Sequence, residues 1–176
     1  MNLDYRYMFE NAAFDPSVVK AADILVKKII DYRNIYKIVE AETKIPWDVI
    51  ACIHAMESSL SLEKHLHNGD PLSDRTVNVP RGRPKDGEPP FSWNESAVDA
   101  LKDLVKPEVW NLEWKLYFLE SYNGFGYHKC GINSPYLWAG TNWYQKGKFT
   151  KDGEYDAEAI SKQIGCAVIL KALTLL

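Results

Sequence analysis

The chain has 176 residues, of which 46% are hydrophobic and 26% are charged, and its formal net charge is −3 at pH 7. This length and composition are typical of one globular domain, and we expect residues 1–176 to form it. The negative net charge argues against nucleic acid as a partner, because a surface that binds phosphate groups has to be basic. We expect no membrane insertion, since the apolar runs are too short to cross a bilayer.

The cysteines and the N-terminus bear on where the chain is made. The three cysteines, Cys52, Cys130 and Cys166, cannot all pair, and their spacing matches no metal-binding motif. Free thiols are typical of a reducing cytoplasm. The first residues lack the basic and apolar segments of a signal peptide. We expect no metal, no cofactor, a monomeric chain and synthesis in the cytoplasm without a signal peptide.

Helical spacing dominates the first part of the chain. Asp15 and Pro16 have the residue types of a helix start, and apolar residues then recur at helical intervals as far as Val39. Pro46 begins a second helix, because proline is tolerated only in the first turn, and this helix runs to about Ser59.

Glu57 occupies an unusual position near the end of this second helix. Ile50, Ile53 and Glu57 follow one another at helical spacing, so they lie on one apolar face. Burying an ionised carboxylate is costly, and the usual response is a raised pKa. A carboxylic acid that keeps its proton near neutral pH can act as a general acid. His54, one turn earlier, is either a partner that orients this acid at the substrate or a core histidine.

The chain after this helix is its least helical part. Asn68 and Gly69 suit a tight turn, and residues 75–79 alternate like a short strand, which together predict a small β-hairpin lobe. Asp70 in the turn and Thr76 on the strand could converge with the helix-end acid on one point of a cleft. Glycoside hydrolysis needs two carboxyl groups, one to protonate the leaving oxygen and one to activate water.

Two further helices follow. Ser92 and Glu95 form a capping box that predicts a helix start, and Pro107 ends this helix. The next helix carries an aromatic stripe, which we interpret as core packing rather than a sugar platform: Trp110, Trp114, Tyr117 and Phe118. Glu120 at the end of this helix is a rival acid, but no second carboxylate or hydroxyl follows it in a comparable turn.

Aromatic residues, glycines and amides alternate between Ser121 and Tyr144. Sugar rings have apolar faces and polar rims, so their binding sites combine aromatic surface with a few amides. Tyr127, Tyr136 and Trp138 are therefore candidate sugar contacts, and the alternative is that these aromatics close the core. Residues 146–153 predict a turn or short hairpin, and a last helix is expected to begin at Asp156.

Three short motifs resemble those of the lysozyme-like superfamily, which includes phage endolysins, goose-type lysozymes and soluble lytic transglycosylases. Glu57-Ser58 resembles the catalytic Glu-Ser of the transglycosylases and goose-type enzymes. Ser121-Tyr122-Asn123-Gly124 resembles their Ala-Tyr-Asn-x-Gly motif. Asp70 and Thr76, with five residues between them, are similar in spacing to an Asp–Thr pair of phage lysozymes. The resemblance covers about residues 45–145, and it lacks the Gly-Leu-Met-Gln motif of the transglycosylases.

The resemblance implies a mainly α (α+β) fold, a lysozyme-like helical domain with a small β-hairpin lobe and a catalytic cleft between them. It implies a glycosidase that cleaves the glycan backbone of bacterial peptidoglycan, with Glu57 as general acid. Asp70 would activate water and Thr76 would help to hold it. Tyr122 would lie near the acid, and Asn123 would contact the glycan. A phage endolysin released through a holin pore fits this activity, as does a delivered effector.

Two alternatives stay open. A lytic transglycosylase would use Glu57 as both acid and base and would give anhydro-muramic products without attack by water. A non-catalytic glycan-binding module would keep the lysozyme-like shape without cleaving any bond. Chitin-type polymers are a further possible substrate, because their backbone sugars are shared with peptidoglycan.

Overall fold

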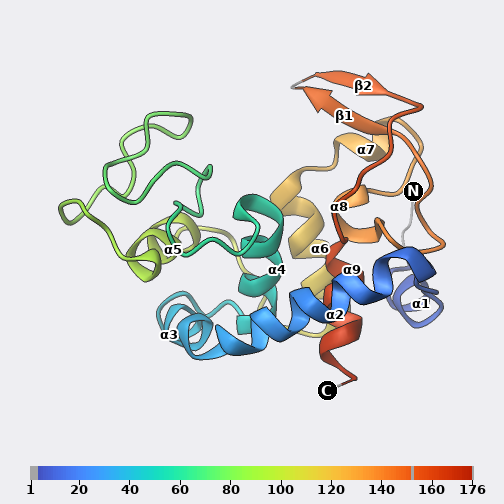
Figure 1. The fold of residues 1–176 in the computed structure, drawn as a ribbon, viewed down its shortest axis with the longest axis horizontal. Coiled ribbons are helices and arrows are strands. Elements are labelled where there is room, and N and C mark those ends of the chain that lie inside the picture. The colour runs from blue at the N-terminus through green and yellow to red at the C-terminus, as the bar shows by residue number, and fades with distance from the viewer. Residues whose placement is uncertain (1–3, 152, 176) are drawn as a thin grey trace. The chain divides into compact units, whose positions relative to one another are not determined.

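The computed structural model describes residues 4–151 and 153–175, and these ranges hold nine helices and one two-stranded antiparallel sheet (Figure 1). The predicted mainly α class with a small β element is therefore confirmed. The chain divides into two compact units. Unit 1 combines Met1–Lys27 with Val109–Leu176, and unit 2 is Lys28–Glu108. The boundary after residue 27 falls within helix α2, Pro16–Asp31.

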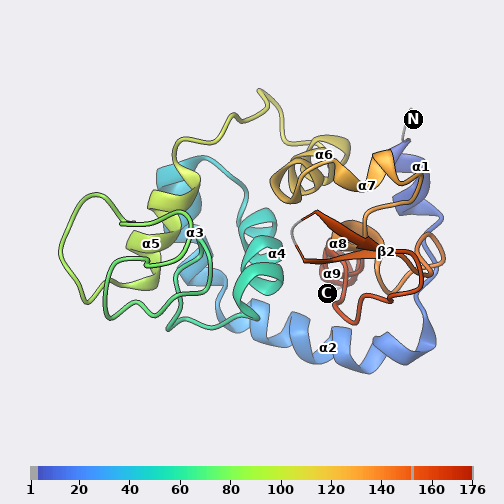
Figure 2. The ribbon, with the colours of Figure 1, turned by 90° about the horizontal axis from the view of Figure 1, so that it is seen from above.

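Unit 2 is built on three helices, α3 (Arg33–Thr43), α4 (Trp47–Ser58) and α5 (Trp93–Leu101). Helix α3 packs against both of the others, and Figure 2 shows it beside α5. Helix α4 is apolar on nearly every side, and eight of its twelve residues are buried. A helix of this kind has no single core-facing stripe. The apolar residues on one side of it therefore do not show whether Glu57 faces the core.

The loop between α4 and α5 replaces the expected hairpin lobe. Within residues 59–92 the only ladder contact is an isolated bridge between Lys64 and Pro71. The tight turn is confirmed, because Gly69 has φ +79° and its amide donates to the His65 carbonyl at 2.9 Å. The strand expected at 75–79 is wrong. The amides of Val77 and Asn78 bond to the Asp70 carboxylate instead of a neighbouring strand, and prolines without an N–H interrupt any longer ladder.

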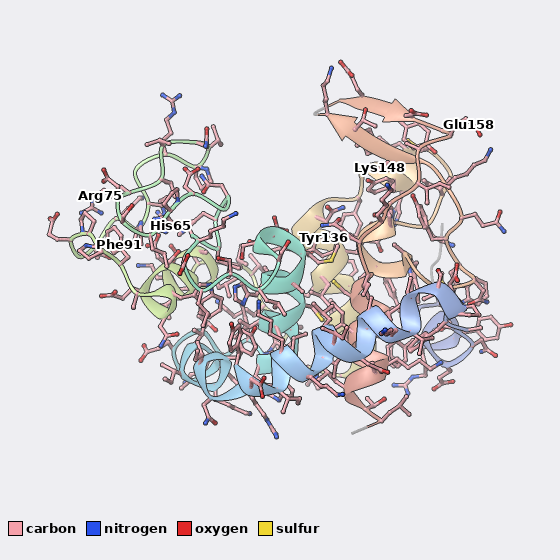
Figure 3. The ribbon with its side chains drawn as sticks, viewed as in Figure 1. His65, Arg75, Phe91, Tyr136, Lys148 and Glu158 are labelled. Atoms are coloured by element: carbon pink, nitrogen blue, oxygen red, sulfur yellow. The ribbon has the colours of Figure 1, made fainter. Side chains whose placement is uncertain are left out.

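Aromatic and basic side chains hold this loop in place. Figure 3 shows His65, Arg75 and Phe91 close together, and the Arg75 guanidinium lies 5.4 Å from the centre of the Phe91 ring. Arg75 also donates to the carbonyl oxygens of Pro84 and Gly87. One side chain thereby fixes the far half of the loop at three points.

A buried polar cluster attaches the same loop to α5. His67 Nε2 lies 3.0 Å from Asp99 Oδ2, and Arg83 Nε donates to the same oxygen at 2.7 Å. His65 Nδ1 lies 2.8 Å from the Ser96 hydroxyl, which is fully buried. Asp99 is only 6% exposed, so its carboxylate depends on these partners in place of water.

Unit 1 contains the remaining helices and strands together with the N-terminal part of α2. They are α1 (Tyr5–Glu10), α6 (Leu112–Asn123), α7 (Gly126–Lys129), α8 (Pro135–Trp138), β1 (Lys148–Lys151), β2 (Glu154–Asp156) and α9 (Cys166–Leu173). Helix α6 contacts α1, α8 and α9. The strands pair in antiparallel register, with Phe149 opposite Tyr155. The hairpin predicted at residues 146–153 is therefore confirmed.

The aromatic stripe of α6 is only partly core. Phe118 is buried as predicted, whereas Trp114 and Tyr117 are 45% and 43% exposed. The helix instead buries Leu116, Leu119 and the neighbouring carboxylate of Glu120. The prediction fails because the apolar residues of this helix lie on two faces, and the leucine face is the one that packs inward.

Candidate functional site

Unit 1 contains an open groove of about 530 Å³ beside the hairpin. Its lining combines aromatic rings, amides and basic residues: Asn123, Tyr127, Tyr136, Lys148, Phe149, Lys151 and Gln163, with Gly124, Gly126, Pro135, Gly153 and Ser161. These residues come from four stretches of unit 1. The first runs from the end of α6 into α7, the second begins α8, the third is β1 with the turn after it, and the fourth is the segment before α9.

Two glycines shape the first wall of the groove. Gly124 ends α6 with φ +89°, a conformation that other residues rarely adopt, and its amide donates to the Glu120 carbonyl at 2.9 Å. Because α6 ends at this glycine, Asn123 is the last residue of the helix, and it is exposed. A Cβ atom on Gly126 would lie 3.4 Å from the Phe149 ring, so the small residue lets the hairpin approach α7 closely.

The hairpin is held against this wall by tyrosine hydroxyls. The Tyr127 hydroxyl accepts a hydrogen bond from the Phe149 amide at 3.3 Å, and the two rings lie 5.0 Å apart. The Tyr144 hydroxyl donates to the Gly147 carbonyl at 3.1 Å. Gly147 itself has φ +96°, and a Cβ atom there would lie 2.2 Å from the Tyr155 hydroxyl. The start of β1, which carries Lys148, is therefore well fixed.

Three of the sequence-predicted sugar contacts, Asn123, Tyr127 and Tyr136, line this groove. Tyr122 is half-buried and lies outside the lining residues. Trp138 is fully buried in α8, so the interpretation of this residue as a sugar contact is wrong. Its ring closes the core where α8 packs on α9, which was the alternative that the sequence left open.

Lys148, Phe149 and Gln163 were missed by the sequence analysis. The hairpin that carries Lys148 and Phe149 was predicted, but its residues were not considered as binding residues. The signal present in the sequence is a lysine next to an aromatic residue in a short strand. Gln163 has no comparable signal, because its position depends on where the segment between β2 and α9 runs.

Glu57 lies in the last turn of α4 and is exposed. The prediction that this carboxyl group faces the core is therefore wrong. The helix ends at Ser58, with Ser59 in the left-handed region at φ 53°, so the apolar stripe has no continuation at this end. A Cβ atom on Gly69 would lie 3.8 Å from the Glu57 carbonyl oxygen, so the tight turn packs beside the end of this helix.

Asp70 is buried, and its carboxylate organises the loop that follows it. Its oxygens accept hydrogen bonds from the amides of Val77 (2.8 Å) and Asn78 (2.9 Å) and from the side chains of Asn78 (2.7 Å) and Asn68 (3.2 Å). The bonds from Asn78 hold the pKa of Asp70 below its ordinary value. A carboxylate can accept about four hydrogen bonds, so the four donors of this loop occupy the acceptor sites of the Asp70 side chain.

Thr76 belongs to the same loop and is also buried. Its hydroxyl donates to the Pro80 carbonyl and accepts from the Arg83 amide at 2.9 Å. Asp70 and Thr76 are thus brought into one loop as expected, but both bond to backbone groups of that loop. Glu57, Asp70 and Thr76 belong to unit 2, whereas the groove belongs to unit 1.

His54 is a core histidine, which is one of the two interpretations that the sequence left open, and its alternative role beside the acid at the substrate is wrong. It is fully buried, and its ring centre lies 4.3 Å from that of Trp93. Nε2 lies 3.0 Å from the Ser61 carbonyl, which can only accept, so this nitrogen donates. Nδ1 lies 3.0 Å from the Tyr36 hydroxyl, which donates to it in this tautomer.

The burial of His54 predicts a pH-dependent stability. Burial lowers the pKa of His54 from 6.5 to about 4, so the folded state resists protonation and the unfolded state does not. The stabilising effect is complete above pH 6.5 and is lost as the pH falls toward 4, which amounts to about 3 kcal/mol. Urea unfolding between pH 7 and 4 should show this loss. His54→Gln should flatten the profile, and equal slopes in both proteins would contradict the assignment.

Glu120, the rival acid, is fully buried between α1, α6 and α7. The Tyr5 hydroxyl donates to Oε2 at 2.5 Å, and His128 Nε2 lies 3.0 Å from Oε1. Burial and this carboxylate raise the pKa of Tyr5 above its ordinary value. The carboxylate therefore joins the N-terminal helix to the rest of unit 1 and is closed to substrate.

Residues 4–151 and 153–175 contain neither a metal-ligand cluster nor a membrane-spanning helix. No group of three or more His, Cys, Asp or Glu side chains in these ranges could hold a metal ion. None of the helices there has both the length and the apolar character needed to cross a bilayer. All three cysteines are free thiols.

No protein-family model, curated protein or solved structure matches this chain.

Proposed function

We propose that this protein is a glycosidase of the lysozyme type that cleaves the glycan backbone of bacterial peptidoglycan. One observation carries the proposal: Asn123, Tyr127 and Tyr136, selected from sequence as sugar contacts, line the same groove. The Glu-Ser and Tyr-Asn-x-Gly resemblances support the same activity. A lysozyme-like fold with a catalytic cleft is part of the proposal. A phage endolysin released through a holin is the setting that the resemblance implies.

The groove suits a sugar chain chemically. Phe149, which is half-buried, supplies aromatic surface for the apolar faces of sugar rings, whereas Tyr127 and Tyr136 line the groove but are only 9% and 6% exposed. Asn123 and Gln163 supply amides for hydroxyl and N-acetyl groups at the rims. A cavity of about 530 Å³ is of the size of small-molecule sites, so it would hold part of a glycan strand rather than its whole length.

Glu57 is the proposed general acid. Its side chain is exposed at the end of a helix whose body is buried, so a rigid element would present a carboxyl group to the substrate. Protonation of the glycosidic oxygen by Glu57 would break the bond and leave positive charge on the sugar ring. The resulting carboxylate can then take a proton from the attacking group. In a hydrolase this group is water.

The bonding of Asp70 favours a second candidate, a lytic transglycosylase. In the hydrolase that the sequence predicts, Asp70 activates water and Thr76 helps to hold it. Both side chains instead bond to groups of their own loop. A transglycosylase needs only Glu57, which takes the proton from a hydroxyl of the same sugar and gives an anhydro product. The sugar at the newly formed end of the products distinguishes the two.

Asn123→Ala tests the groove. Asn123 is exposed at the end of α6, so thermal stability should not change. Loss of one hydrogen bond to the glycan costs about 1 kcal/mol, which corresponds to roughly a fivefold drop in kcat/KM for release of soluble fragments from sacculi. Gln145→Ala is the matched control, because this exposed amide lies outside the lining residues. Equal rates in both variants would remove the groove from the proposal.

A non-catalytic glycan-binding module is the remaining alternative. It predicts binding of sacculi by the wild type and by Glu57→Gln, without release of soluble sugar by either. The glycosidase predicts release by the wild type and binding alone by the variant. One pull-down and one release assay on the same sacculi therefore separate the two.

A further inference from the structure

We infer that Lys148 makes the groove of unit 1 selective for a sugar that carries a carboxylate over a neutral amino sugar. The inference rests on the proposed function, since it names the chemical feature of the glycan that this groove recognises. In peptidoglycan the carboxylate comes from the lactyl group of a muramic residue or, where a peptide is attached, from that peptide. Chitin-type chains carry neither.

Lys148 is placed where its ammonium can meet a ligand. It begins β1 next to Gly147 and Phe149, is half-buried, and lines the groove together with Tyr136. Figure 3 shows Lys148 and Tyr136 in the part of unit 1 below the hairpin, whereas Glu158 lies at the level of the strands. The fixed backbone of Gly147 limits how far the lysine can move away from a bound ligand.

The charges around the groove single out this lysine. The described residues that line it include Lys148 and Lys151 and no carboxylate. The Lys151 ammonium lies 3.5 Å from Glu154 Oε2, so its charge is partly offset. Lys148 makes no ion pair with any residue of the ranges 4–151 and 153–175.

The acidic residue opposite Lys148 bonds to backbone amides rather than to this lysine. Asp156 pairs with Lys148 in the strand register, but its Oδ1 accepts hydrogen bonds from the amides of Glu158 (2.8 Å) and Ala159 (3.2 Å). The preceding lysine, Lys146, bonds both carboxylate oxygens of Glu158 at 2.7 Å. Among the described residues that line the groove, Lys148 is therefore the lysine without a salt bridge, on a chain whose net charge is −3.

A half-buried cation of this kind discriminates by charge. Hydrogen bonds between an ammonium and a carboxylate are about twice as strong as those between neutral groups, and a partly desolvated site screens them less than water does. Neutral oligomers would bind through the aromatic rings and amides alone. Lys148 thus acts as a specificity residue, whereas Asn123 and the aromatic rings serve both kinds of sugar.

The test measures affinity by titration calorimetry in a Glu57→Gln background, which prevents turnover. The probes are neutral chitotetraose, the peptide-free GlcNAc-MurNAc disaccharide, and the same disaccharide with its peptide. Lys148→Gln should weaken binding of at least one carboxylate-bearing probe about tenfold and leave chitotetraose unchanged. Lys148→Arg should retain the preference, and Lys146→Gln, the matched control, should change nothing.

The probe that responds identifies the carboxylate. Loss confined to the peptide-free disaccharide assigns the lactyl group, and loss confined to the peptide form assigns the peptide. Equal loss for chitotetraose and the charged probes, or no loss for any of them, would overturn the inference. Charge-selective binding without any cleavage by the wild type would refute the glycosidase and leave the role of Lys148 standing.

Discussion

Replacing Glu57 with glutamine should reduce the rate of glycan cleavage by about 10²–10⁴-fold, the usual contribution of a general acid. Glutamine keeps the size and hydrogen-bonding shape of the side chain but has no carboxyl proton to give to the leaving oxygen. Release of soluble fragments from purified sacculi measures the rate.

The fold should survive this substitution. Glu57 is exposed in the last turn of α4, and the core of unit 2 is formed by other residues of that helix. The thermal midpoint of Glu57→Gln should therefore match that of the wild type. Glu63→Gln is the matched control, because Glu63 is an exposed carboxylate six residues away in the following loop. Comparable rates in the two variants would show that Glu57 is not the acid.

Asp99→Asn should lower the free energy of unfolding by about 3–5 kcal/mol, which is the usual cost of removing one partner of a buried ion pair. The Asp99 carboxylate accepts from Arg83 Nε at 2.7 Å and lies 3.0 Å from His67 Nε2. Asparagine removes the negative charge, so the guanidinium of Arg83, whose side chain is 16% exposed, is left with neutral acceptors such as the residue-99 carbonyl, which it contacts at 3.0 Å. Urea unfolding at pH 7 gives the value.

A double variant separates charge from packing. Asp99→Asn combined with Arg83→Met removes both charges, so most of the lost stability should return. Asp103→Asn is the control, because this carboxylate is exposed one turn further along the chain. A loss below about 1 kcal/mol in Asp99→Asn would mean that water already compensates Arg83.

Local signals in the sequence predicted several elements correctly. The capping box forms as expected, with the Glu95 amide donating to the Ser92 hydroxyl at 3.3 Å and the Ser92 amide donating to the Glu95 carboxylate at 2.7 Å. The hairpin at residues 146–153 and the turn at Gly69 also follow from residues next to each other in the chain. Such elements depend on neighbours that a sequence shows directly.

Elements that depend on distant groups were predicted less well. Asp156 was expected to start the last helix, and its carboxylate does bond the amides of Glu158 and Ala159. The helix begins only at Cys166, because distant residues hold the intervening segment. The Gly147 amide donates to the Ala159 carbonyl at 2.8 Å, and the Tyr144 hydroxyl accepts from the Ser161 amide at 2.9 Å.

The same distinction applies to the candidate site. The composition of residues 121–144 identified Tyr127 and Tyr136 and the family resemblance identified Asn123, and all three line the groove. Composition could not separate Tyr136, which lines the groove, from Trp138, which fills the core two residues later. Burial of Glu57 was inferred from one stripe of a helix that is apolar all round, so the stripe carried no information.

Mass spectrometry of the products from purified sacculi treated with the wild-type protein is the measurement that tests the glycosidase most directly. The proposal predicts soluble muropeptides produced by cleavage between backbone sugars. A reducing sugar at the new end would establish a hydrolase, and an anhydro-muramic end would establish the lytic transglycosylase favoured by the bonding of Asp70. Sacculi that stay insoluble, or fragments cut only within the peptides, would contradict the proposed function.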